Sequence, residues 1–244
     1  MSVQNIFTGS YYEKDPRWSA VDGYTISHLH PPTRPNHAPL VHALEHARDE
    51  GLPDIATQPV MGKFLALQCR IGRVKHALEI GTLGAYTSIW LATENPEIKV
   101  TSVEVDPKHA RVARENIEAA GVGDRVEVVE GSGLDVLPRL AKEIKEGKRE
   151  KFGFVYIDAD KQNNWAYFDM AVGMCEIGGS IYVDNMVFMG AVVAEEHQGD
   201  ERIKGIRKVI ENAGKDKRVN AVIMQTVCEK TYDGVLIAVV VKNE

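Results

Sequence analysis

From Val74 onward, short apolar runs typical of β-strands alternate with longer runs of helical periodicity. The strand-like runs read HALEI, KVTSVEV, RVEVVEG, FGFVYID and SIYVD. Such alternation predicts parallel strands joined by helical crossovers, because a parallel neighbour is reached only through a long connection. The last two runs, NAVIMQTV and GVLIAVVVK, have only CEKTYD between them and should pair antiparallel. The sequence therefore predicts an α/β protein with a doubly wound, mostly parallel sheet.

The chain before this alternation has a different character. Residues 1 to about 38 are rich in Pro, His and aromatic side chains, and the prolines of the segment 30–39 exclude a long helix there. Pro39 suits the first turn of a helix through LVHALEHARDEG, and QPVMGKFLALQCRIG has the pattern of a second amphipathic helix. We therefore expect a helical N-terminal extension over residues 1–52 and a main domain over residues 53–244, forming one structural unit.

Charge and cysteine content narrow the class of partner and the compartment. The net charge of −6 argues against a nucleic acid or an anionic membrane as the main partner, because both select a basic surface. The three cysteines, Cys69, Cys175 and Cys228, are far apart in the sequence, which fits a reducing compartment. The N-terminal segment lacks a signal-peptide pattern, and no apolar run approaches the ~20 residues of a membrane span. We expect a cytoplasmic protein.

Polar side chains follow two of the strand-like runs. Asp158, Asp160 and Lys161 come directly after FGFVYI, and the pair Asp184–Asn185 follows SIYV. Ligands bind such sheets at the carboxyl ends of the strands, and two carboxylates with an amide oxygen suit Mg²⁺ or Ca²⁺ better than zinc. A single Asp here would usually be a helix cap, but two on neighbouring strands favour a metal site. A nearby cation would lower the pKa of Lys161 toward the range of a general base, although a surface lysine fits the sequence equally well.

The first two strand-like runs also end in acidic residues or glycines. Gly81 and Gly84 allow a tight turn, but their spacing is not G-x-G-x-x-G, so a pyrophosphate-binding turn is poorly supported. Glu79 precedes this turn inside an apolar strand, where an acid suits a cationic or amine-bearing ligand better than a surface position. Glu104 is expected to accept the two hydroxyls of a ribose, whereas Asp106 is expected to cap the following helix.

The segments that carry these residues resemble those of a known family. ALEIGTLGAYTS, VEVD, GSGLDVLP, FVYIDADK and GGSIYVDNMVFMG are similar, in this order, to the cation-dependent, S-adenosylmethionine-dependent O-methyltransferases of the caffeoyl-CoA and catechol type. The resemblance covers roughly residues 53–241, and the N-terminal segment is more similar to microbial members than to plant ones. It implies the class I methyltransferase fold, a Rossmann-like seven-stranded sheet with an antiparallel final strand, and a homodimer. Residues 53–244 would then be the catalytic domain that binds S-adenosylmethionine.

The resemblance also assigns roles to residues at the matching positions. The divalent metal, Mg²⁺ first and Ca²⁺ or Mn²⁺ as alternatives, would be held by Asp158, Asp184 and Asn185, and the catalytic residues would be Lys161 and Asp158. The cofactor would be bound by Thr57, Glu79, Gly81, Thr82, Thr87, Glu104, Gly133, Asp158 and Asp160. The acceptor would be contacted by Phe188 and Met189, in a loop where family members often carry Trp at the position of Phe188. The chain also has Ala85 and Thr87 where the family usually has Gly and Ser.

The implied reaction is transfer of a methyl group from S-adenosylmethionine to a hydroxyl of a small catechol-like or phenolic acceptor. Both vicinal oxygens of a catechol would bind the metal, Lys161 would accept the hydroxyl proton, and the phenolate would attack the sulfonium methyl in line. A tRNA-modifying methyltransferase of the same fold is one alternative, and the negative net charge argues against it. A non-catalytic protein that binds S-adenosylmethionine is the other, and the complete set of metal and base residues argues against that.

Overall fold

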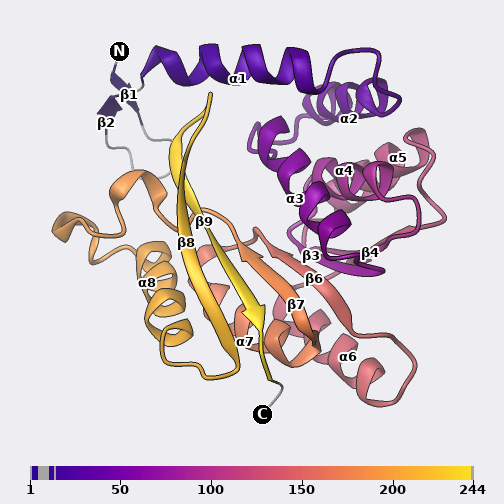
Figure 1. Cartoon of the computed structure of the whole chain (residues 1–244), viewed down its shortest axis with the longest axis vertical. Helices are drawn as coiled ribbons and strands as arrows, with labels where there is room; N and C mark the ends of the chain where they lie inside the picture. Colours follow the sequence, from indigo (N-terminus) through magenta and orange to yellow (C-terminus); the bar gives the residue numbers. More distant parts are fainter. Residues whose placement is uncertain (1, 5–10, 14, 243–244) are drawn as a thin grey trace.

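A seven-stranded sheet forms the centre of the molecule. The computed structural model describes residues 2–4, 11–13 and 15–242. The strand order is β5-β4-β3-β6-β7-β9-β8 (Figure 1). The strands are β3 (His76–Ile80), β4 (Lys99–Glu104), β5 (Val126–Glu130), β6 (Phe152–Ile157), β7 (Cys175–Val183), β8 (Val219–Val227) and β9 (Tyr232–Val240). Strand β9 is antiparallel to both of its neighbours, and the other adjacent pairs are parallel. The predicted mostly parallel sheet with an antiparallel end is confirmed.

Helices cover both faces of this sheet, because successive side chains of each buried strand point to opposite faces. On β6, Phe154 and Tyr156 belong to one core cluster, and Val155 and Ile157 belong to the other. The first cluster is completed by helices α2 (His37–Asp49), α3 (Pro59–Ile71), α4 (Tyr86–Glu94) and α5 (Pro107–Ala119). The second is completed by α6 (Gly133–Lys145), α7 (Asn164–Met174) and α8 (Glu201–Ala213).

The N-terminal region is helical, but its boundaries differ from the sequence expectation. Helix α1 (Pro16–Leu29) begins after Asp15, whose side chain accepts a hydrogen bond from the backbone N–H of Arg17. Helix α2 begins at His37, two residues before Pro39, because Pro39 is compatible with a helical first turn but does not fix its first residue. A two-stranded antiparallel sheet, β1 (Ser2–Gln4) with β2 (Tyr11–Glu13), precedes both helices.

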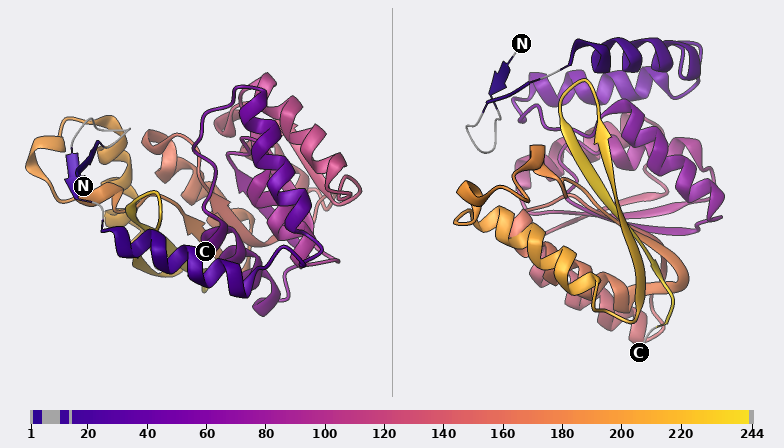
Figure 2. Two further views of the ribbon diagram at one scale, coloured as in Figure 1. Left: turned by 90° about the horizontal axis from the view of Figure 1, so that it is seen from above. Right: turned by 60° about the vertical axis from the view of Figure 1, so that its left-hand side comes forward.

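Helix α1 lies across one end of the molecule and buries none of its residues (Figure 1). Figure 2 shows the turn between β8 and β9 rising toward it. The backbone N–H of Glu229 in this turn donates to the Asp22 carboxylate at 2.8 Å. The ammonium of Lys230 lies 3.2 Å from Asp54, in the segment between α2 and α3. The turn between the two antiparallel strands therefore contacts the N-terminal region. No helix among the described residues is both long and apolar enough to cross a membrane.

The ends of the central strands are held together by backbone hydrogen bonds. The N–H of Asp158 donates to Ile80 at 2.9 Å, and the N–H of Asp184 donates to Ile157 at 3.0 Å. On the other side, the N–H of Gly81 donates to Val103 at 2.9 Å. The carboxyl ends of β4, β3, β6 and β7 therefore lie side by side, although these strands are far apart in the sequence. The chain turns to opposite sides after β3 and β6, which is where ligands bind in sheets of this type.

Candidate active site

A cavity of about 1840 Å³ opens at these strand ends. Its wall includes α2, α3, the strand ends and the turn between β8 and β9. The predicted site residues that line it are Thr57, Gly81, Thr82, Thr87, Glu104, Gly133, Asp158, Asp160, Lys161, Asp184, Asn185, Phe188 and Met189. Glu79 is the one predicted site residue that does not line it. The structure thus brings nearly the whole predicted set to one cavity.

The turn from β3 into α4 needs glycine at its first position. Gly81 has a φ of 102°, and a Cβ there would lie 2.3 Å from the carbonyl oxygen of Asp158. Leu83 and Ala85 also have positive φ, at 49° and 64°, so the departure from glycine at residue 85 is accommodated in the left-handed region. Gly84 does not have positive φ, and its Cβ would meet the side chain of Ala47 at 3.1 Å. Close packing against β6 and α2 therefore shapes this turn.

Glu79 lies behind the cavity wall, contrary to the expectation that it lines the cofactor site. It is 1% exposed, and one of its carboxyl oxygens accepts hydrogen bonds from Ser88 and Ser102, each at 2.5 Å. Burial raises the pKa of Glu79 to about 7, although the two hydroxyl donors act in the opposite direction. Side-chain direction along β3 explains the difference, because Glu79 points to the face covered by α4. Glu79 therefore supports the turn from beneath.

Glu104 occupies the end of β4, with its carboxylate held in one orientation. Its Oε2 accepts from the backbone N–H of Leu83 at 2.8 Å, and its Oε1 accepts from that of Asp106 at 2.9 Å. Each oxygen keeps a second lone pair, so the carboxylate can still accept two hydroxyl donors. Asp106 caps α5, accepting from the backbone N–H groups of Lys108 and His109, as the sequence predicts. The end of β4 thus presents a carboxylate of fixed orientation to the cavity.

Tyr167 joins Gly133 to Asp160 and was not predicted from the sequence. Its hydroxyl donates to the Asp160 carboxylate at 2.5 Å, and its ring fills the place that a side chain at Gly133 would need. A Cβ at Gly133 would lie 2.7 Å from this ring. Asp160 also accepts from Asn163 in the 3₁₀ turn η1 (Lys161–Asn163). Gly133, Asp160 and the Tyr167 ring therefore lie in contact with one another in the wall of the cavity that Glu104 also lines.

Lys161 and Asp158 form an ion pair at the end of β6. The Lys161 Nζ lies 2.6 Å from Asp158 Oδ1, and the two side chains are 12% and 23% exposed. Burial alone would lower the pKa of Lys161, but the charges of Asp158, Asp184 and Asp233 outweigh it and raise that pKa. The sequence-based expectation of a lowered pKa depended on a nearby cation, and the protein's own charges act in the opposite direction. Proton acceptance by Lys161 therefore requires added positive charge at this point.

A chain of hydroxyl groups connects Asp184 with the other side of the cavity. The Tyr156 hydroxyl donates to Asp184 Oδ2 at 2.5 Å and lies 3.5 Å from the hydroxyl of Thr57. Thr57 in turn accepts from Thr87 at 2.9 Å. Burial and the negative charge of Asp158 raise the pKa of Asp184. Tyr156 was missed in the sequence, although it lies on β6 only two residues before Asp158.

The predicted metal ligands line the same cavity, but they include only two carboxylates. Among the described residues, no cluster of three or more His, Cys, Asp or Glu side chains is arranged to hold a metal ion. The predicted set consists of Asp158, Asp184 and the amide of Asn185, whose backbone N–H donates to Asp184 Oδ1. Two interacting, partly buried carboxylates with an amide oxygen are the donor set that hard cations prefer. The residues present therefore fit a divalent cation such as Mg²⁺.

The loop after β7 has an unusual backbone and a buried anchor. Phe188 and Met189, in the 3₁₀ turn η2 (Phe188–Gly190), have φ values of 52° and 55°. The Phe188 side chain is 1% exposed and packs in the core beneath Arg202, so Met189 is the more accessible of the two predicted acceptor residues. Asp233 at the start of β9 accepts hydrogen bonds from this loop. It was overlooked in the sequence, where CEKTYD was interpreted only as a short connection.

Comparison with known proteins gives a consistent result. A family model described as O-methyltransferase matches residues 35–239. The chain is 52% identical over 240 residues to the O-methyltransferase imqG of Aspergillus flavus, covering 98% of this chain and 97% of that protein. It is 41% identical over 202 residues to a catechol O-methyltransferase of Mycobacterium tuberculosis, covering 82% and 88% of the two chains. The crystal structure of an O-methyltransferase from Bacillus cereus in complex with SAH has a TM-score of 0.83 and 41% identity, covering 92% and 98%.

Proposed function

The chain belongs to the O-methyltransferase family, and we propose that it uses a divalent cation to move a methyl group from S-adenosylmethionine to a small catechol-like or phenolic acceptor. The relative from Mycobacterium tuberculosis, named as a catechol O-methyltransferase, supports the class of acceptor. The relative solved with SAH supports the cofactor.

One arrangement carries the proposal. The carboxyl groups of Asp158 and Asp184 and the ammonium of Lys161 line the same cavity as Gly81 and Glu104. A cofactor seated at the ends of β3 and β4 would lie beside an acceptor seated at the ends of β6 and β7, because these strand ends are neighbours in the sheet. Such placement lowers the barrier of a two-substrate reaction, by up to about 7–11 kcal/mol in the best intramolecular cases.

At the cofactor end, the chain's own residues would hold the ribose and the adenine. Glu104 is the proposed acceptor of the two ribose hydroxyls, because its oxygens are fixed by backbone donors and keep free lone pairs. Gly133 and Asp160 would border the adenine, where the ring of Tyr167 leaves no room for a side chain at Gly133. Thr82 and Thr87 would border the methionine end, together with Thr57.

At the acceptor end, Lys161 is the proposed proton acceptor. Its Nζ lies 2.6 Å from Asp158 Oδ1, so a hydroxyl bound beside that carboxylate would be close to it. When bound at Asp158, Asp184 and Asn185, a divalent cation would supply Lewis acidity to the acceptor oxygens and offset the charge that raises the pKa of Lys161. The apolar lining contributed by Phe64, Tyr182, Met189 and Met224 supports an aromatic acceptor.

A second copy of the chain is the proposed protein partner. Strand β8 is at the edge of the sheet, where Val222 is 56% exposed, and Tyr24 and Leu29 on α1 are 67% and 64% exposed. Helix α1 buries none of its residues within one chain. Exposed apolar side chains on an edge strand are costly unless covered, which supports a homodimer. Light scattering should give twice the mass of one chain, and a value matching a single chain would refute the dimer.

The first experiment measures methyl transfer from labelled S-adenosylmethionine to catechol and to phenol, with added Mg²⁺ and with EDTA. We expect transfer to catechol that requires Mg²⁺, and much less transfer to phenol, which has a single oxygen to present. Transfer that is unaffected by EDTA would refute the role of the metal. Binding of S-adenosylmethionine without transfer to either compound would refute the proposed acceptor class.

A further inference from the structure

Asp233 is a buried carboxylate that the proposed reaction does not use. It is 5% exposed, at the second residue of β9. Its Oδ1 accepts backbone hydrogen bonds from Val187 at 3.1 Å, Phe188 at 2.8 Å and Gly234 at 2.8 Å. Its Oδ2 accepts from the side-chain amide of Asn185 at 3.0 Å. Both oxygens are therefore directed at the loop that follows β7.

The contact between Asp233 and Asn185 matters because the two ends of an amide have similar shapes and opposite chemistry. Only the oxygen of Asn185 can bind a cation, whereas its NH₂ group can only donate. Oδ1 of Asp233 accepts from three backbone donors, and its Oδ2 accepts from the NH₂ group of Asn185, so that group faces Asp233. The amide oxygen is then left for the site formed with Asp158 and Asp184.

The backbone hydrogen bonds of Asp233 have a second consequence. They hold a loop in which Asn185, Phe188 and Met189 all have positive φ, a conformation that non-glycine residues adopt only when their surroundings impose it. Because Asn185 has a φ of 59°, a relaxed loop would also move its side chain. One carboxylate thus holds the loop backbone at Val187 and Phe188, close after Asn185, and also orients the Asn185 amide.

We propose that Asp233 is a positioning residue that selects the cation-binding orientation of the Asn185 amide. The inference rests on the proposed cation site at Asp158, Asp184 and Asn185. Carboxylates that orient metal ligands in this way typically contribute 10–100-fold to metal affinity.

The test exchanges the carboxylate and the amide. In Asp233→Asn, the new amide oxygen can still accept from the three backbone N–H groups, so its NH₂ group faces Asn185. The Asn185 amide must then turn its oxygen toward residue 233 and its NH₂ group toward the cation site. We expect Mn²⁺ binding, followed by the electron paramagnetic resonance of free Mn²⁺, to weaken about 10–100-fold. The melting temperature and the affinity for SAH should be unchanged.

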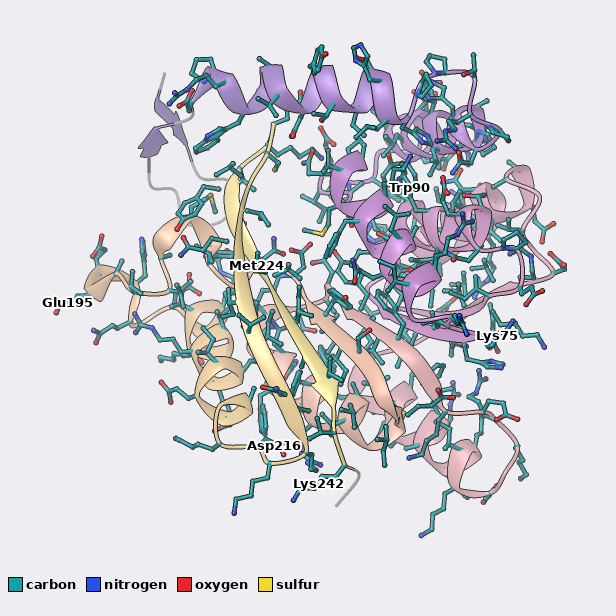
Figure 3. The ribbon with its side chains drawn as sticks, in the orientation of Figure 1. Lys75, Trp90, Glu195, Asp216, Met224 and Lys242 are labelled. Carbon is teal, nitrogen blue, oxygen red and sulfur yellow. The ribbon has the colours of Figure 1, made fainter. Side chains whose placement is uncertain are left out.

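The double variant Asp233→Asn with Asn185→Asp restores a donor–acceptor pair and the total charge. A carboxylate at residue 185 accepts from the new amide with one oxygen and presents the other to the cation, so Mn²⁺ affinity should recover. Asp216→Asn is the control, because Asp216 also accepts a hydrogen bond from a backbone N–H. It lies just before β8, far from Met224, the residue of that strand that lines the cavity (Figure 3). It should bind Mn²⁺ like the unchanged protein.

Each outcome decides the proposal. Undiminished Mn²⁺ affinity in Asp233→Asn would overturn it. A loss that the double variant does not recover, with a lowered melting temperature, would overturn it too, because Asp233 would then serve the fold alone. Absence of Mn²⁺ binding in the unchanged protein would instead refute the proposed cation site, and this inference with it.

Discussion

The cavity has two halves, and the buried carboxyl group of each half is surrounded by a different kind of neighbour. We call the ends of β3 and β4, where the cofactor is proposed to bind, the cofactor half. The acceptor half is the ends of β6 and β7 with the loop to η2, where the acceptor is proposed to bind. Each contains a buried acid whose pKa is raised, Glu79 in the first and Asp184 in the second. Glu79 is surrounded by neutral hydroxyl donors, so it can keep its proton without leaving a charge unpaired. Asp184 faces Asp158 and Lys161 and belongs to a cluster of charges.

This difference indicates how each half should respond to change. The cofactor half is built from backbone geometry and neutral hydrogen bonds, so it should be sensitive to added atoms and to pH. The acceptor half is built from opposed charges, so it should be sensitive to the removal of a charge. Substitutions that keep the shape of a side chain can distinguish the response to a lost charge from the response to added atoms.

The largest effect is expected from Asp184→Asn, which removes one charge of the acceptor half at constant shape. The kcat/KM for a catechol should fall about 10³-fold, because the change removes a proposed ligand of the cation. Lewis-acid stabilisation by such a cation is worth several kcal/mol, and each 1.4 kcal/mol is about tenfold. The affinity for SAH should be unchanged, because Asp184 lies outside the cofactor half. Asp124→Asn, at an exposed acid, is the control and should have full activity. Equal losses of turnover and SAH affinity would mean that the two halves are not separate.

The two halves also differed in how far the sequence could predict them. The strand ends that carry Glu104, Asp158 and Asp184 were predicted because each lies within a few residues of a recognisable strand, and parallel pairing brings them together. Asp233 was missed because its partner Asn185 is 48 residues away, and only the antiparallel pairing of β7 with β9 makes them neighbours. The sequence could place Glu79 at the end of β3, but the depth of its side chain depends on how α4 packs.

The fold was predicted more completely than the site. The alternation of strand and helix fixes the parallel sheet, and the short connection before β9 fixes its antiparallel end. Helix α1 could not be delimited, because none of its residues is buried and its sequence has no clear apolar stripe. Contacts that depend on packing across the sheet, such as the Tyr167 ring under Gly133, are not encoded in any local pattern.

The next largest effect is expected where the two halves touch. In Gly81→Ala, the new Cβ would lie 2.3 Å from the Asp158 carbonyl at a φ of 102°, so β3 or β6 must shift. Backbone strain and overpacking together should lower the free energy of unfolding by about 3–4 kcal/mol, measured in urea. Gly121→Ala is the matched control, because it has a φ of 67° and no atom within 4 Å of its Cβ. A loss no larger than that of the control would show that the contact between the halves is not tight.

A smaller effect, on the pH dependence of stability, is expected from Glu79, the buried acid of the cofactor half. The pKa of Glu79 is raised from 4.5 to about 7, so the native state keeps a proton that the unfolded chain loses between these values. Stability therefore falls as pH rises through this window and levels off above it. From about pH 5.5 to pH 8.5, this contribution amounts to roughly 2 kcal/mol.

Glu79→Gln tests that contribution, because the amide oxygen can still accept from Ser88 and Ser102 but does not titrate. Urea unfolding across the same pH range should show a loss of stability that is roughly 2 kcal/mol smaller than in the unchanged protein. Glu211→Gln, at an exposed position on α8, is the control and should keep the original pH dependence. An unaltered pH dependence in Glu79→Gln would mean that Glu79 is already ionised in the native state.

The smallest effect concerns Tyr156, whose hydroxyl lies between the halves. It donates to Asp184 and lies 3.5 Å from Thr57, which accepts from Thr87. Tyr156→Phe removes one hydrogen bond to a charged group, so kcat/KM should fall about tenfold. Tyr24→Phe, at a tyrosine of α1 that is 67% exposed and does not line the cavity, is the control and should have full activity.

Combining Tyr156→Phe with Thr87→Val decides whether this hydroxyl chain joins the halves. If the chain transmits the orientation of Thr87 to Asp184, the two losses in kcat/KM will not add, because either change breaks the same connection. Additive losses would mean that each residue acts only within its own half. The cavity would then consist of two independent sites that share a wall, and the coupling of cofactor and acceptor would depend on their proximity alone.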